Sequence, residues 1–143
     1  MQAMSDVKTQ ALRRVPLFAH CSNRELEFVA SRTDEVDVPE GRALVRQGQP
    51  GDTFYVLLEG SADVEVDGAG RPALGPGDFF GEISMLDRGP ATATVVTTAP
   101  CRLMVMSHSQ FRDAVKGSED LLGQVMVAMG ERLRADSLAR RSA

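Results

Sequence analysis

The segment from Gly77 to Val95 contains the residues whose types and spacing best suit ligand binding in this chain. Within it, Gly81 is followed by an acid, Glu82, and by a short run that can form one helical turn. The first turn of a helix carries N–H groups without acceptors and the positive end of the helix dipole, so this segment can hold a phosphate. A carboxylate beside such a site suits a ribose hydroxyl, as in dinucleotide-binding folds. A glycine followed by an acid is, by itself, also typical of a surface turn.

The residues around this segment extend the pattern over most of the chain. Glycines, acids and aromatics occur in the order Gly48, Gly51-Asp52, Tyr55, Gly60, Gly77-Asp78 and Phe80-Gly81-Glu82. In this order and spacing, from about Val15 to Leu133, the chain resembles the cyclic nucleotide-binding domain family, whose modules regulate kinases, channels and bacterial transcription factors. The resemblance implies a mainly β fold, a jelly roll or double-stranded β-helix barrel with flanking helices. It also implies a regulatory role in signal transduction, with cAMP or cGMP as the ligand.

The resemblance further implies roles for the residues of the Gly77–Val95 segment. The backbone N–H groups of Gly81 and Ser84 are expected to face the ribose hydroxyls and the phosphate. Glu82 is expected to accept a hydrogen bond from the ribose 2′-hydroxyl, and Ile83 to lie against the sugar. Thr92 falls where the family often has a small residue or a hydroxyl that touches the phosphate or a guanine. Thr92 therefore does not distinguish cAMP from cGMP.

Two further parts of the chain are expected at the nucleotide because of the same resemblance. Val64 and Leu74 are expected to lie against the base. The long final helix is expected to fold over the base as a lid and to pass the bound state to a protein partner.

One position departs from the family's pattern. The family's phosphate-binding arginine directly follows the proline, and this chain has Ala91 after Pro90. Loss of a charge-assisted hydrogen bond of that kind costs about 1.5–3 kcal/mol, which is about ten- to more than a hundredfold in affinity. Arg88 could supply the charge instead, or the backbone donors and Thr92 could suffice. Alternatively, the domain no longer binds a cyclic nucleotide and acts as a protein-interaction module.

Length and composition limit the other possibilities. The 143 residues are expected to form a single domain, and their composition is that of a globular protein. Without a signal peptide or an apolar run of membrane-spanning length, the protein is expected to be cytoplasmic. The net charge of −4 with no basic stripe makes nucleic acid an unfavoured partner.

Cys21 and Cys101 are far apart and lack metal-ligand spacing, so neither a metal nor a disulfide is expected. Adjacent acids fall only at expected helix starts, and no nucleophile accompanies a histidine, so no enzymatic activity is expected.

Helices are expected on both sides of a β region. The helical lead-in covers residues 5–32, with a short helix at 5–14 and a second one from Asn23 to about Ser31. A capping box, Ser22 with Glu25, marks the start of the second helix. The spacing of Ser107 and Gln110 repeats this motif, so the C-terminal helices are expected over 107–138, broken at Gly117-Ser118. The last of them, from Glu119 to about Leu138, could pack on its own barrel or form a homodimer. Its apolar stripe comprises Leu122, Val125, Met126, Met129 and Leu133.

Residues 34–106 show the pattern of a β roll, with short strands separated by glycine turns. Phe54 to Leu58 is continuously apolar, which predicts a strand covered on both faces. Residues 62–66 alternate between apolar and acidic side chains, which predicts one buried face, and 67–70 form a hairpin turn. Residues 92–98 and 102–106 supply the last pair of strands.

Overall fold

The computed structural model describes the backbone of residues 2–142 and the side chains of residues 8–82, 84–85, 87–127, 130–131 and 134. The chain begins with three helical elements, α1 (Gln2–Arg13), the 3₁₀ turn η1 (Pro16–Phe18) and α2 (Asn23–Ser31). The predicted capping box of α2 is confirmed, because the Ser22 hydroxyl accepts from the Glu25 N–H at 3.1 Å and Glu25 accepts from the Ser22 N–H at 2.9 Å. The first helix begins three residues earlier than the sequence predicts.

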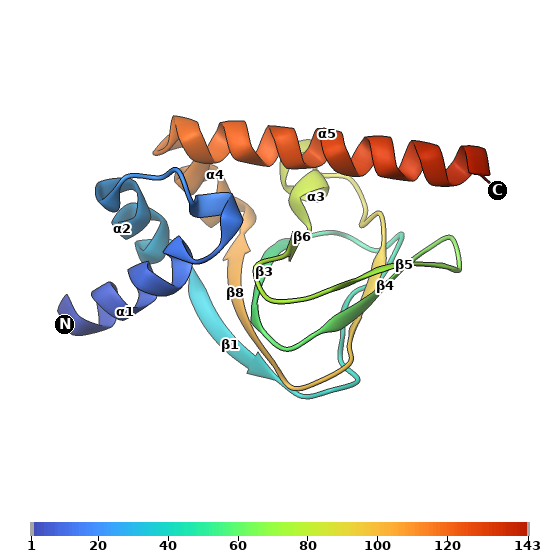
Figure 1. Ribbon diagram of the computed structural model, residues 1–143, viewed down its shortest axis with the longest axis horizontal. Helices are drawn as coiled ribbons and strands as arrows, with labels where there is room; N and C mark the ends of the chain where they lie inside the picture. Colours follow the sequence, from blue (N-terminus) through green and yellow to red (C-terminus); the bar gives the residue numbers. More distant parts are fainter. Residues whose placement is uncertain (1, 143) are drawn as a thin grey trace.

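Eight antiparallel strands form two four-stranded sheets, which confirms the predicted roll of β-strands with flanking helices (Figure 1). The first sheet has the order β1-β8-β3-β6 and the second has the order β2-β7-β4-β5. The strands of the first sheet are β1 (Asp34–Val38), β8 (Cys101–Ser107), β3 (Thr53–Glu59) and β6 (Phe79–Phe80). Those of the second are β2 (Ala43–Val45), β7 (Thr94–Thr97), β4 (Ala62–Val66) and β5 (Ala69–Leu74).

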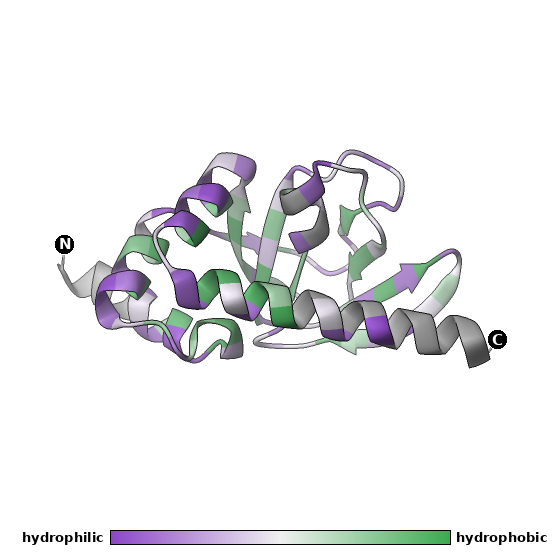
Figure 2. Cartoon of the chain, turned by 90° about the horizontal axis from the view of Figure 1, so that it is seen from above, coloured by the Kyte–Doolittle hydropathy of each residue, from purple (hydrophilic) through white to green (hydrophobic). Residues whose placement is uncertain are grey.

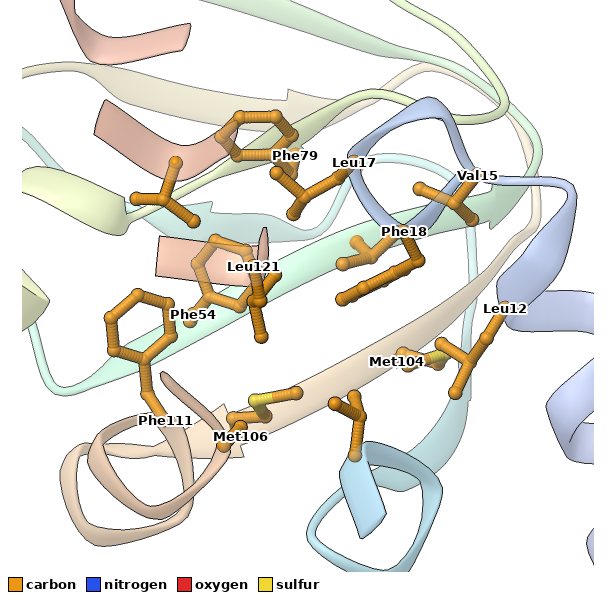
Figure 3. Packing of buried hydrophobic residues seen from close by; sticks show 14 of the residues in the cluster. Leu12, Val15, Leu17, Phe18, Phe54, Phe79, Met104, Met106, Phe111 and Leu121 are labelled. Carbon is orange, nitrogen blue, oxygen red and sulfur yellow. The ribbon is translucent and has the colours of Figure 1, made fainter. Parts of the chain in front are cut away.

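The central strand β3 is covered on both faces, as its unbroken apolar run predicts. On one face, Phe54 and Val56 join the main core together with the helices on both sides of the roll (Figure 3). On the other face, Leu57 and Tyr55 point between the two sheets and pack in a separate cluster. Successive side chains of a strand point to opposite faces, so one apolar strand serves both clusters.

The predicted hairpin connects β4 to β5. Asp67 and Gly68 connect β4 to β5, and both have positive φ (+54° and +78°), which is typical of a two-residue type I′ turn.

The last two strands, β7 and β8, do not pair with each other. Instead β7 pairs with β2 and β4, whereas β8 pairs with β1 and β3. The chain therefore crosses from one sheet to the other at residues 98–100.

Two helices follow the roll, α4 (His108–Lys116) and α5 (Glu119–Ser142). The capping box of α4 is confirmed by the reciprocal bonds of Ser107 and Gln110. Ser118, which is 2% exposed, begins α5 by accepting from the Leu121 N–H at 3.1 Å, and its hydroxyl donates to the carboxylate of Glu25. One carboxylate therefore joins the starts of α2 and α5. The pKa of Glu25 is lowered, chiefly by the hydrogen bond from Ser118 and further by the N–H of Ser22.

The apolar stripe predicted on α5 is divided between the core and the surface. Leu121 and Val125 are the side chains buried in the main core, at 2% and 0% exposed, whereas Leu122 and Met126 face outward at 38% and 62%. Among the described side chains of α5, Leu121 and Val125, which are four residues apart, pack against residues of the N-terminal helices, α3 and α4. Seen from above, α5 lies along the outside of the roll (Figure 2). The side chains of Met129 and Leu133 lie outside the described residues.

The described helices include none that combines the length and apolar character of a membrane span.

Candidate functional site

The predicted helical turn after Gly81 is a short helix, α3 (Glu82–Asp87). Gly81 precedes it with φ +91°, a conformation that residues with a Cβ rarely adopt. A Cβ at this position would lie 2.5 Å from the carbonyl oxygen of Thr53, so glycine is also required by space. The turn therefore sets α3 directly on the start of β3. The first N–H groups of α3 have no acceptors within the helix.

The loop between β2 and β3 closes against α3 and against the segment that contains Ala91. A Cβ on Gly51 would lie 2.2 Å from the Ser84 hydroxyl, so only glycine allows this approach. The Ser84 hydroxyl is within 3.3 Å of the Pro90 carbonyl and donates to it. The Ala91 N–H donates to the Gln49 carbonyl at 2.8 Å, and the Gly48 N–H donates to the Ala91 carbonyl at 2.9 Å. Both backbone groups of Ala91 are thus used within the protein.

A cavity of about 840 Å³ lies beside this arrangement. The predicted site residues that line it are Gly81, Glu82, Ser84, Ala91, Thr92, Val64 and Leu74. Small-molecule sites have volumes of roughly 300–1,000 Å³, and they combine apolar walls with a few polar groups. The structure therefore brings together residues that are far apart in the sequence into a site of nucleotide size.

Two stacked rings lie along the cavity. Tyr55 and Phe80 have ring centroids 4.8 Å apart and an interplanar angle of 15°. The Tyr55 hydroxyl donates to the Leu44 carbonyl at 3.3 Å, and burial raises the pKa of Tyr55. The ring pair fixes the spacing between β3 and β6, just before the chain enters Gly81.

Charged side chains of both signs line the cavity. The acids are Asp52, Asp78 and Glu82, and the cations are Arg46 and Arg71. Glu82 is 2% exposed, which is rare for a carboxylate. Asp78 is held by the N–H of Gly75 at 2.8 Å. No group of three or more potential metal ligands occurs in the part of the chain that the structure describes.

Arg88 does not line this cavity. It ends α3 with φ +57° and lines, together with His108, Gly89 and Pro90, an adjoining depression that shares Pro50, Gly51 and Asp52 with the cavity. The side chain of Ile83 lies outside the described residues. Sequence reasoning missed Arg46 and Arg71 as cavity residues. Arg46 follows β2 and Arg71 lies within β5, and they reach the same cavity only because the folded strands bring these distant segments together.

Comparison with known proteins places this fold and cavity in a class. A family model described as the cyclic nucleotide-binding domain matches residues 35–118, which is more than half of the chain. The chain therefore belongs to the cyclic nucleotide-binding domain family. It is 30% identical over 113 residues to the cAMP-dependent protein kinase regulatory subunit of Aspergillus niger, a match that covers 78% of this chain and 28% of the relative.

Solved structures show the same fold at lower identity. The regulatory domain of Toxoplasma gondii PKA, crystallised with cAMP, is 23% identical with a TM-score of 0.77, and the match covers 94% of this chain and 51% of that one. The regulatory subunit of a cAMP-independent protein kinase A from Trypanosoma brucei is also 23% identical with a TM-score of 0.77, covering 93% and 47%. This chain spans about half the length of these two structures and about a quarter of the curated relative. At this identity the structures share the fold alone; the first was crystallised with cAMP, and the second belongs to a kinase described as cAMP-independent.

Proposed function

We propose that this chain is a regulatory module that captures cAMP or cGMP in the 840 Å³ cavity and passes the bound state to α5. The observation that carries the proposal is the convergence of Gly81, Glu82, Ser84 and Thr92 on one cavity in a chain of the cyclic nucleotide-binding domain family. In this arrangement the Glu82 carboxylate accepts from the ribose 2′-hydroxyl. The N–H of Ser84 faces the phosphate, and Val64 and Leu74 lie against the base.

Calorimetric titration with cAMP and with cGMP tests this proposal. The Glu82→Gln variant keeps the size of the side chain and removes its charge, so cAMP affinity should fall about tenfold or more. The 2′-deoxy analogue of cAMP lacks the hydroxyl that Glu82 is proposed to bind, so it should bind the variant and the wild type almost equally. Equal losses for cAMP and its 2′-deoxy analogue would rule out this role of Glu82.

A protein-interaction module that binds no cyclic nucleotide is the second candidate, and Ala91 favours it. This side chain is 7% exposed and presents only a methyl group to the cavity. The matched test is the Ala91→Arg variant, which adds a guanidinium at this point. If only the variant binds cAMP, the wild-type cavity is intact but lacks a sufficient countercharge, and the second candidate is supported.

The route from the cavity to α5 passes through α3. This helix packs against β3, α4 and α5, and Met85 of α3 shares the main core with Leu121 and Val125 of α5. A ligand that shifts α3 therefore acts on the first turns of α5 through direct packing. Hydrogen exchange of the α5 amides, measured with and without cAMP, tests this coupling. Unchanged protection at saturating cAMP would exclude it.

A protein partner or a second copy of the chain is proposed to bind α5. Leu122, Met126 and Val127 form an exposed apolar group on the described part of this helix, at 38%, 62% and 58% exposed. Sedimentation of the wild type and of Met126→Lys tests the second-copy case. A concentration-dependent dimer that the substitution abolishes would support it, and a monomer throughout would leave the heterologous partner.

A further inference from the structure

A phosphate that enters the cavity needs a positive charge to neutralise it, and few side chains of the cavity lining are positively charged. A singly charged cyclic nucleotide would meet three acids there, Asp52, Asp78 and Glu82. An anion transferred from water into such surroundings is costly unless a cation compensates it. Ala91 contributes no charge, and Arg88 lines a different depression. Among the described residues of the lining, the cations are Arg46 and Arg71.

These two arginines differ in their surroundings. Arg71 belongs to β5, where it pairs with Val64 at the wall proposed for the base, and it already interacts with another group of the protein. Arg46 follows the last residue of β2 and lines the cavity, and its side chain is exposed. Within the part of the chain that the structure describes, its guanidinium has neither an ion pair nor a hydrogen bond. Its five donors are therefore available to a ligand.

The backbone places Arg46 beside the Ala91 segment. Val45 pairs with Val95 and, after the chain turns at residues 46–49, the Gly48 N–H donates to the Ala91 carbonyl at 2.9 Å. Between these two points, the Gln47 N–H donates to the Thr94 hydroxyl at 3.0 Å.

Residues 46–49 form a turn, in which the Gln49 N–H donates to the Arg46 carbonyl at 3.1 Å, so Arg46 stays close to the residues that are bonded to Ala91. Arg46 and Ala91 line the same cavity. An extended arginine carries its guanidinium about 6–7 Å from its Cα, so Arg46 can reach toward the Ala91 methyl group from the β2–β3 loop.

We propose that Arg46 is the countercharge for the phosphate of the ligand, supplied from the β2–β3 loop beside Ala91. This inference rests on the proposed capture of a cyclic nucleotide, and it assigns a specificity role to Arg46. A guanidinium binds a phosphate through two parallel charge-assisted hydrogen bonds, so Arg46 selects a phosphorylated ligand. Because Arg46 is exposed, its contribution is smaller than that of a buried arginine and is screened by salt.

Titration of the full chain with cAMP at low and high salt tests this role. Arg46→Gln should weaken binding about tenfold at low salt, and its affinity should change less with salt than that of the wild type. Arg42→Gln is the matched control. It removes the same charge four residues earlier from another exposed side chain, outside the cavity lining, and it should leave affinity within twofold. The double variant Arg46→Gln/Ala91→Arg should recover binding, because the new arginine replaces the lost charge at the same phosphate.

These measurements distinguish a failure of the role of Arg46 from a failure of the proposed function. If the wild type binds cAMP and Arg46→Gln binds equally well, or no worse than Arg42→Gln, the role of Arg46 is overturned while the proposed function stands. If the wild type binds neither cAMP nor cGMP, the proposed function fails, and Arg46 does not supply a sufficient charge. Loss of binding without recovery in the double variant would also overturn the inference, because Arg46 would then act on something other than the phosphate.

Discussion

The contact between Ser118 and Glu25 joins two helices that lie 93 residues apart in the sequence, and it can be removed without disturbing the core. We expect Ser118→Ala to destabilise the fold. The substitution removes the acceptor for the Leu121 N–H at the start of α5, and such a serine cap contributes about 1 kcal/mol. It also removes the hydroxyl that donates to Glu25, which adds some tenths of a kcal/mol in a partly exposed site. A total of about 1.5 kcal/mol corresponds to a fall in melting temperature of about 5 °C for a chain of this size.

The pH dependence of the folding stability identifies the contribution of Glu25 to that stability. Its pKa is lower in the folded state than the ordinary value of 4.5, so its stabilising effect is complete above that value and is lost as the pH falls through the folded-state pKa. Calorimetric melting of the wild type, Ser118→Ala, Glu25→Gln and the double variant should show non-additive effects at pH 7. As the pH is lowered below 4.5 and Glu25 takes up a proton, the non-additivity should shrink. Strictly additive effects at pH 7 and throughout this acid range would refute the claim that one carboxylate couples α2 to α5.

Three further predictions concern single positions. Gly81→Ala should destabilise the fold by about 2 kcal/mol or more in urea unfolding, because φ is +91° and the new Cβ would meet the Thr53 carbonyl; an unchanged midpoint would contradict this geometry. Gly123→Ala should stabilise α5 by about 0.5–1 kcal/mol, because no heavy atom lies within 4 Å of the added Cβ, and a lower melting temperature would show a contact at that position. The Cys21 thiol should react with iodoacetamide at pH 8 only as fast as the protein opens, because burial raises its pKa; peptide mass spectrometry measures this, and rapid labelling of the native protein would disprove it.

The helices and the central strand could be predicted from the sequence because their determinants are local. Ser22 with Glu25, and Ser107 with Gln110, carry within four residues all the groups needed to start a helix, and both capping boxes are present. The burial of β3 is likewise predictable from the run Phe54 to Leu58 alone, because a strand without polar positions must be covered on both faces.

The positions that sequence reasoning missed depend on contacts between distant segments. On α5, apolar residues are frequent enough that the period fits more than one face, and packing against η1, α3 and α4 selects Leu121 and Val125. Arg88 is close to Ala91 in the sequence, but the left-handed backbone that ends α3 places it at another depression. Arg46 is 45 residues from Ala91, and only the pairing of residues 45–49 with 91–95 makes them neighbours.

The two faces of β3 have a consequence for how this domain can change over time. Phe54 and Val56 hold the roll to its helices, whereas the cavity is built on the opposite face, beside Tyr55, and from the second sheet. A substitution of a cavity side chain other than the required glycines therefore leaves the main core intact and has little effect on folding. A change at position 91 can therefore alter or abolish ligand recognition in a protein that still folds. Ligand preference and folding stability thus depend on largely separate sets of residues.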